Sequence, residues 1–135
     1  MYESGGTYSV RNLTRNESLA EKAQLADSGW ARIKGLIGCA SRDFIGGMAL
    51  WIRPSQGIHT FGMAFPIDVV YVNAKRRVVR IYSRLPPNRI AALSLKTWSI
   101  IELPAGTLEQ TGTQIGDQLE FVSNAMMGDA ERTGT

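Results

Sequence analysis

The clearest strand pattern lies in residues 66–72, which read PIDVVYV. Apolar residues occupy both sides of an extended chain there, and Asp68 is the one charged residue among them. Pro66 can open such a strand because its missing N–H group does least harm at the first position. The mostly polar residues 73–77 (NAKRR) then predict a hairpin turn, and residues 78–82 (VVRIY) predict the returning strand.

Shorter patterns predict further strands. They lie at residues 7–13, at the edge of a sheet, and at residues 48–52, 98–103 and 117–122. Residues 17–26 have the composition of a helix but also alternate as a strand does, so both structures stay open for this segment.

Helical signals are few. A short helix is predicted at residues 29–37, with Trp30 and Ile33 packed on the sheet, and one helical turn at residues 105–112, closed by Gly112. Short strands joined by glycine and proline turns predict a mainly β fold, a compact antiparallel β-sandwich or barrel with one or two short helices. The hairpin leaves no room for an intervening helix, which excludes a doubly wound α/β fold.

The chain length of 135 residues is typical of a single domain. We expect an ordered core over about residues 7–122 and a loose tail over residues 123–135, which lack an apolar pattern. No signal peptide and no apolar run long enough to span a membrane is visible, so we expect a cytoplasmic protein without a membrane partner.

The positive charge is unevenly distributed. Between Val69 and Ile101 the chain has seven basic residues and no acidic one, within a net charge of +3. This segment permits attraction to an anionic partner, and the candidate contacts are Arg76, Arg77, Arg80 and Arg84. The ordinary alternative is a solvated strand face. We expect only weak, non-specific binding of nucleic acid, because the segment lacks interleaved aromatic residues.

The only histidine, His59, is the first candidate for a general base or a metal ligand. A zinc site would need about three more ligands, and the spacing to Cys39 and Asp68 matches no metal motif. We therefore expect neither a metal nor a cofactor.

A pair formed by His59 and Asp68 would resemble two-thirds of a hydrolase triad, with Thr60, Ser55 or Ser99 as the third member. The structural alternative is a histidine bonded to backbone groups and a buried carboxylate with its own hydrogen-bond partners. The chain reverses at residues 61–63, so we predict that His59 and Asp68 lie near each other, with the imidazole bonded to the carboxylate.

Because residues with catalytic chemistry are few, a binding or accessory module with a pocket near His59 is the leading hypothesis, and an enzyme is less favoured. Its partner would be a small molecule, a peptide or a protein. The predicted lining is His59, Thr60, Phe61, Met63, Asp68 and Trp51. The alternatives are a small hydrolase or lyase that uses His59 and Asp68, and a weak binder of anionic partners through residues 75–96.

Five strings of the chain carry a family resemblance: WARIKGLIG, GGMALWI, IHTFGMAFPIDVVYV, IIELPAGTLEQTG and GDQLEF. In this order they resemble the bacterial and archaeal domain of unknown function family 192, from about Ser18 to Phe121. The most specific part is IHTFGM-x-FPIDVV. The resemblance implies a compact, mainly β, jelly-roll-like or barrel-like domain, and it implies no reaction and no cofactor.

The chain departs from the family pattern at three positions. Ala64 and Cys39 stand where basic residues are common, which argues against an anion site at Ala64 and against a shared nucleophile at Cys39. Arg76 stands where glycine is usual. The resemblance therefore implies that Arg76 adopts a positive φ angle in the hairpin turn.

Overall fold

The structure is a computed structural model that describes residues 6–27 and 39–125. The strands are β1 (Thr7–Asn12), β2 (Glu17–Ala26), β3 (Met48–Ile52), β4 (Ile67–Val72), β5 (Val78–Leu85), β6 (Ser99–Pro104) and β7 (Leu119–Ser123). One α-helix, α2 (Thr107–Thr111), and one 3-10 helix, η1 (Ser41–Asp43), lie wholly within these ranges. The helix predicted at residues 29–37, with Trp30 and Ile33, falls outside the described residues. No helix of the described chain is long and apolar enough to cross a membrane.

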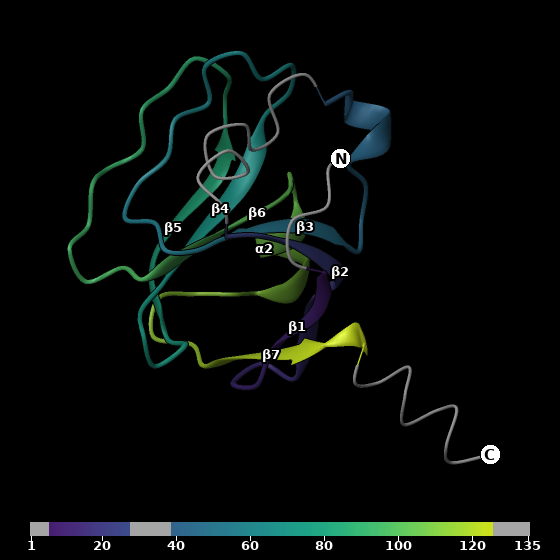
Figure 1. Ribbon diagram of the computed structural model, residues 1–135, viewed down its shortest axis with the longest axis vertical. Helices are drawn as coiled ribbons and strands as arrows, with labels where there is room; N and C mark the ends of the chain where they lie inside the picture. Colours follow the sequence, from purple (N-terminus) through teal and green to yellow (C-terminus); the bar gives the residue numbers. More distant parts are fainter. Residues whose placement is uncertain (1–5, 28–38, 126–135) are drawn as a thin grey trace.

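The strands form one sheet in the order β5-β4-β6-β3-β2-β1-β7. Figure 1 shows this sheet curling from β4 and β5 round to β1 and β7 as a half-barrel. The predicted mainly β, barrel-like fold is confirmed, whereas the topology does not show a jelly roll. The prediction of antiparallel strands is wrong at one place, since β2 and β3 run parallel. That pairing is possible because the chain between them is long enough to cross over.

The strand predicted at the edge, β1, lies inside the sheet, so that prediction is wrong. It pairs with β2 on one side and with β7 on the other, where Tyr8 lies opposite Ser123. A partner so distant in sequence leaves no local signal. The edges of the sheet are β5 and β7.

The segment that the pattern left open, Glu17–Ala26, is a strand. It pairs with both β1 and β3, and its last four residues are all buried. β1 pairs along most of β2, and β3 pairs with residues 22–26, so the second half of the strand has partners on both edges. This pairing outweighs the helical propensity of the residues.

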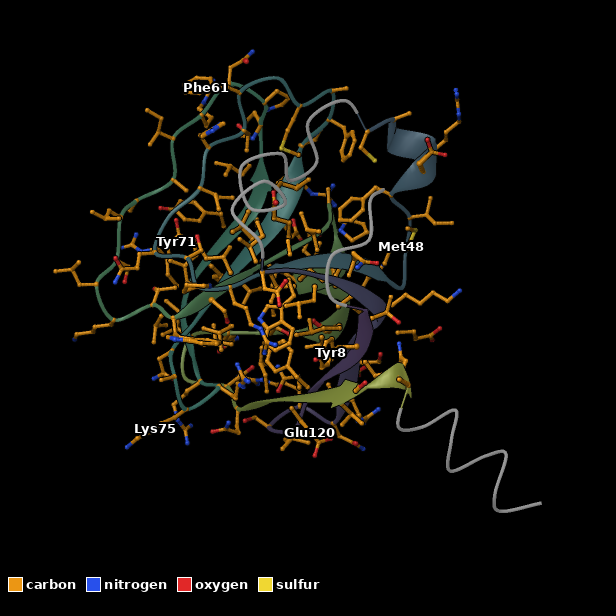
Figure 2. The ribbon with its side chains drawn as sticks, in the orientation of Figure 1. Tyr8, Met48, Phe61, Tyr71, Lys75 and Glu120 are labelled. Atoms are coloured by element: carbon orange, nitrogen blue, oxygen red, sulfur yellow. The ribbon has the colours of Figure 1, made fainter. Side chains whose placement is uncertain are left out.

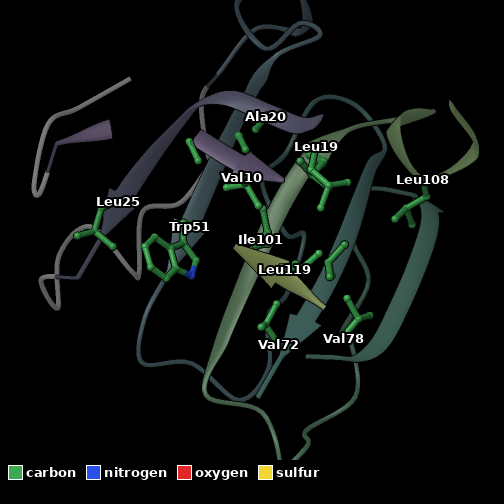
Figure 3. Packing of buried hydrophobic residues seen from close by; sticks show 14 residues of the cluster. Val10, Leu19, Ala20, Leu25, Trp51, Val72, Val78, Ile101, Leu108 and Leu119 are labelled. Atoms are coloured by element: carbon green, nitrogen blue, oxygen red, sulfur yellow. The ribbon is translucent and has the colours of Figure 1, made fainter. Parts of the chain in front are cut away.

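Strand β4 separates two apolar clusters. Val70 and Val72 belong to the inner cluster, which draws on all seven described strands and is seen in Figure 3. Val69 and Tyr71 belong to the outer cluster on the opposite face. Because successive strand residues point to opposite faces, Asp68 shares the inner face with Val70. All six residues of β4 are buried, so both faces of this strand are covered.

The hairpin between β4 and β5 turns at residues 73–77, as predicted. The side chain of Asn73 accepts hydrogen bonds from the backbone N–H groups of Lys75 and Arg77, each at 3.0 Å. Arg76 has a φ angle of 65°, which confirms the expected left-handed conformation. The predicted helical turn is α2, and Gly112 closes it with a φ angle of 69°.

The C-terminal strand β7 ends at Ser123, one residue beyond the expected end of the core. The side-chain amide of Asn124 then donates hydrogen bonds to Thr7 Oγ1 at 3.1 Å and to the Glu21 carbonyl at 3.0 Å. Ordered packing therefore reaches into the predicted tail. Residues 126–135 lie outside the described chain.

Candidate functional site: a hollow beside His59

Two segments far apart in sequence, residues 56–61 and 88–94, pair outside the main sheet. His59 and Ile90 form an antiparallel bridge. The backbone hydrogen bonds run from Ala91 to Ile58 at 2.9 Å, from Thr60 to Arg89 at 2.8 Å and from Ser94 to Gln56 at 2.8 Å. We call these two paired segments the ribbon.

The fully buried side chain of Thr60 links the two segments of the ribbon. Its hydroxyl donates to the Pro86 carbonyl at 2.7 Å while it accepts from the Arg89 N–H at 2.8 Å. Since both hydroxyl functions are used, Thr60 holds the chain after Pro86 against the His59 segment. This predicted lining residue therefore supports the site without facing it.

Two tyrosines of the main sheet fix the middle of the ribbon. The Tyr71 hydroxyl donates to the Ala92 carbonyl at 2.7 Å, and the Tyr82 hydroxyl accepts from the Ala92 N–H at 2.8 Å. Burial, with a further contribution from Tyr82, raises the pKa of Tyr71 to about 12. Tyr71 therefore stays protonated and remains a hydrogen-bond donor at any physiological pH.

An open hollow of about 530 Å³ lies against the ribbon. Its lining includes Ile58, His59, Phe61, Ile90, Ala91 and Leu93, and none of its lining residues is Asp, Glu, Lys or Arg. Three of these side chains are large, apolar and exposed: Phe61 by 46%, Ile90 by 76% and Leu93 by 73%. Figure 2 shows Phe61 at the outer margin of the molecule. The hollow thus presents uncharged, largely apolar surface to its surroundings.

His59 is exposed at the rim of this hollow. Its Nδ1 accepts a hydrogen bond from the Phe61 N–H at 3.3 Å, and the two rings lie 5.3 Å apart. The bond to Nδ1 leaves Nε2 as the ring nitrogen available to a bound group. Met63 is 7% exposed and belongs to the outer cluster, so it supports the loop instead of lining the hollow.

Asp68 has a different environment from the one predicted. Its carboxylate accepts hydrogen bonds from the backbone N–H groups of Arg84 at 2.8 Å, Gly106 at 3.1 Å and Leu108 at 2.8 Å. It is fully buried on the inner face of β4, where it ties β5 and the start of α2 to the sheet.

The expected hydrogen bond between His59 and Asp68 is therefore not formed among the described residues. The two side chains bond different groups: His59 lines the hollow together with Ala91 of the outer cluster, whereas Asp68 lies on the inner face of β4. The prediction assumed that the turn would bring them face to face. The side-chain alternation of β4 instead directs Asp68 away, so the triad-like arrangement lacks its carboxylate.

Trp51 also lies outside the hollow. It is fully buried in the inner cluster and stacks on Phe121 of β7. Within the described residues, no three His, Cys, Asp or Glu side chains gather as metal ligands would.

The four arginine candidates have different surroundings. Arg77 donates to the Gly116 carbonyl at 2.8 Å, and Arg84 forms an ion pair with Glu109 at 3.0 Å. Arg80 is exposed on β5, whereas Arg76 extends over the ring of Trp51.

Sequence reasoning missed Ile90 and Leu93. Their segment, NRIAALSL at residues 88–95, follows Pro86-Pro87 and has no strand or helix period. The available signal was the presence of aliphatic residues in a segment without strand or helix periodicity. Such residues have no sheet or helix face on which to be buried, which favours exposure.

Comparison with known proteins places this fold among relatives. The model of the family DUF192, described as "Uncharacterized ACR", matches residues 11–121. A UPF0127 protein of Pyrococcus horikoshii is 31% identical over 115 residues, which cover 83% of this chain and 97% of the relative. A UPF0127 protein of Thermococcus sibiricus is 27% identical over 115 residues, with coverages of 82% and 72%.

Two solved structures resemble this fold. A protein of unknown function from Novosphingobium aromaticivorans has a TM-score of 0.70 at 20% identity, and the match covers 84% of this chain and 83% of that chain. A candidate transcription regulator from Sinorhizobium meliloti has a TM-score of 0.73 at 16% identity, with coverages of 90% and 96%. At these identities the likeness concerns the fold alone.

Proposed function

The chain belongs to the DUF192 family, and we propose that its domain is a binding module that holds an apolar segment of a partner protein in the hollow beside His59. The observation that carries this proposal is the exposure of Phe61, Ile90 and Leu93 around one hollow. Contiguous exposed apolar surface of this kind marks interaction sites, because leaving it in water is unfavourable.

The ribbon is firmly held before any partner arrives. Thr60 and the two tyrosines, Tyr71 and Tyr82, fix both of its segments through hydrogen bonds of 2.7–2.8 Å. A surface that is already ordered loses little conformational entropy on binding. Exposed apolar side chains on an ordered backbone therefore favour recognition of a partner.

The shape of the hollow favours a protein segment over a small molecule. Small-molecule sites usually bury most of their ligand, whereas this hollow is open and Ile90 and Leu93 project from it. An apolar segment of a partner would cover these projecting side chains. The lack of charged residues in the lining favours an uncharged contact, with the imidazole of His59 as a polar group at the rim.

The test uses N-acetyl-tryptophanamide, an uncharged probe with one apolar side chain, followed by two-dimensional ¹H–¹⁵N NMR. We expect shifts confined to residues 56–61 and 88–94. Leu93→Asp should abolish them, because a carboxylate would enter the apolar lining. Ile115→Asp is the matched control, since Ile115 is also exposed, by 63%, and does not line the hollow.

The proposal fails if the shifts spread over the surface without preference, or if Leu93→Asp binds the probe as the parent does. It also fails if Ile115→Asp weakens binding as much as Leu93→Asp. Melting curves of both variants establish that each is folded before binding is compared.

A further inference from the structure

Aromatic rings pack around Trp51 on the inner face. Trp51 stacks on Phe121 with ring centroids 4.1 Å apart and planes inclined by 20°. Tyr8 meets Trp51 edge-on at 5.0 Å. Figure 3 shows Trp51 beside Leu25, on the side of the inner cluster opposite Leu108.

Two guanidinium groups lie over these rings. The Cζ atom of Arg53 is 4.5 Å from the ring centroid of Trp51, and that of Arg76 is 4.9 Å from the same centroid. Both also approach Trp98, at 5.9 Å and 5.4 Å. We call Trp51, Arg53, Arg76, Trp98 and Phe121 the arginine–aromatic cluster. Each contact with a ring is favourable, but two positive charges that share one ring repel each other.

No carboxylate of residues 6–27 and 39–125 forms an ion pair with Arg53 or Arg76. The ion pairs between these described residues join Arg15 to Asp117 and Arg84 to Glu109. Burial, followed by the nearby charge of Arg53, lowers the pKa of Arg76. The cluster therefore brings two cations together in a partly dehydrated place.

Hydrogen-bond donors in the same region also lack acceptors. Four buried side-chain atoms of the described residues have no hydrogen-bond partner: Trp51 Nε1, Arg76 Nη1, Thr97 Oγ1 and Ser99 Oγ. Trp51 and Ser99 are fully buried. Ser99 lies two residues before Ile101, which is opposite Trp51, so Trp51 and Ser99 are diagonal neighbours on the inner face.

Native structures leave few buried polar groups unpaired, because such a group has lost its hydrogen bonds to water without gaining a partner. In Figure 3 the indole nitrogen of Trp51 lies on the ring edge nearer Val72, and Val72 is the partner of Ser99 across β4 and β6. A ligand with several acceptor oxygens would satisfy the donors and balance the charges together.

We infer that the arginine–aromatic cluster is a binding site for a phosphate group. A phosphate dianion matches the two guanidinium charges, and its oxygens accept the parallel N–H groups that a guanidinium presents. The hydroxyl of Ser99 and the indole N–H of Trp51 add neutral donors. This inference rests on residues separate from the hollow beside His59 and does not depend on the proposed function.

The probe is inorganic phosphate, compared with acetate and chloride at equal ionic strength and equal pH. Binding is followed by the indole N–H signals in ¹H–¹⁵N NMR, with the Trp51 signal identified by its loss in Trp51→Phe. We expect phosphate to shift the Trp51 signal in a saturable way, and acetate and chloride to leave it nearly unchanged. Arg53→Gln and Arg76→Asn should each weaken phosphate binding by at least about tenfold, the effect of one charged hydrogen-bonding partner.

Asparagine is chosen at position 76 because it tolerates the left-handed conformation of the turn, at a φ angle of 65°. Arg53→Lys keeps the positive charge without the forked donor and should bind with intermediate affinity. Arg80→Gln is the charge-matched control, since Arg80 is exposed on β5 and outside the cluster.

The inference is overturned if phosphate leaves the Trp51 indole signal in place, or if chloride moves it equally. Equal binding of acetate would overturn the assignment to phosphate. Loss of affinity in Arg80→Gln as large as in Arg53→Gln would show that the effect is screening of net charge. These outcomes concern the arginine–aromatic cluster and Ser99, none of which lines the hollow, so they do not bear on binding of N-acetyl-tryptophanamide at the ribbon.

Discussion

A buried acid in β6 should make this protein less stable as the pH rises. Glu102 lies between Leu50 of β3 and Val69 of β4, and it is only 3% exposed. Burial raises its pKa from 4.5 to about 8, because the charged form loses its hydration there. The carboxyl group is therefore mostly neutral in the folded protein at pH 7.

The size of the effect follows from this difference in pKa. Because the folded pKa of Glu102 is raised, the stability associated with its protonated form is complete below about pH 4.5 and is lost as the pH rises through about 8. At about 1.36 kcal/mol for each pKa unit, the full loss is about 5 kcal/mol. Integrated only between pH 5 and pH 8, the same relation gives a loss of about 3–4 kcal/mol.

The assay is urea denaturation at pH 5 and pH 8. Wild-type protein should lose about 3–4 kcal/mol of unfolding free energy between these two pH values. Glu102→Gln keeps the size of the side chain and removes its titration, so the variant should lose much less. Glu120→Gln, at an exposed position of β7, should behave like the wild type. Equal pH dependence in wild type and Glu102→Gln would refute the reasoning.

Five further substitutions test three remaining structural claims. Asp68→Ala leaves three backbone N–H groups without an acceptor and should lower the free energy of unfolding by about 3 kcal/mol or more. His59→Ala, at an exposed site, should change it by less than about 0.5 kcal/mol. Melting curves that reverse this order would contradict a structural role for Asp68. In urea denaturation, Arg76→Gly should have a free energy of unfolding about 1 kcal/mol higher than Arg76→Ala. Both variants lose the guanidinium group, and only alanine is strained at a φ angle of 65°. Equal stability of the two variants would argue against that strain. Burial raises the pKa of Asp117, but hydrogen bonds led by the one from Arg15 outweigh this effect and lower the pKa below 3.8. The Asp117 carboxylate therefore stabilises the fold above that pH and loses its contribution as the pH falls. Asp117→Asn should make the free energy of unfolding fall less steeply at acid pH, and an unchanged acid dependence would contradict this role of Asp117.

Local sequence determined the hairpin between β4 and β5 and its strained turn. The alternation of residues 67–72, the polar residues after Val72 and the position of Arg76 each act over a few residues, so they are readable without the fold. The single turn of α2 is of the same kind, because Gly112 ends it through its own backbone conformation. Two of the predicted lining residues, His59 and Phe61, border the hollow of the structure.

Tertiary structure decided the features that depend on distant partners. Glu17–Ala26 became a strand because β1 and β3 pair with its two edges, and the parallel pairing of β2 with β3 left no trace in either strand. Asp68 found backbone N–H groups on β5 and α2 instead of His59. The exposure of Leu93 and the burial of Trp51 likewise depend on what covers each residue. A short sequence pattern indicates which face of a strand is apolar. Which segment covers that face, or whether it stays exposed, depends on how the whole sheet assembles.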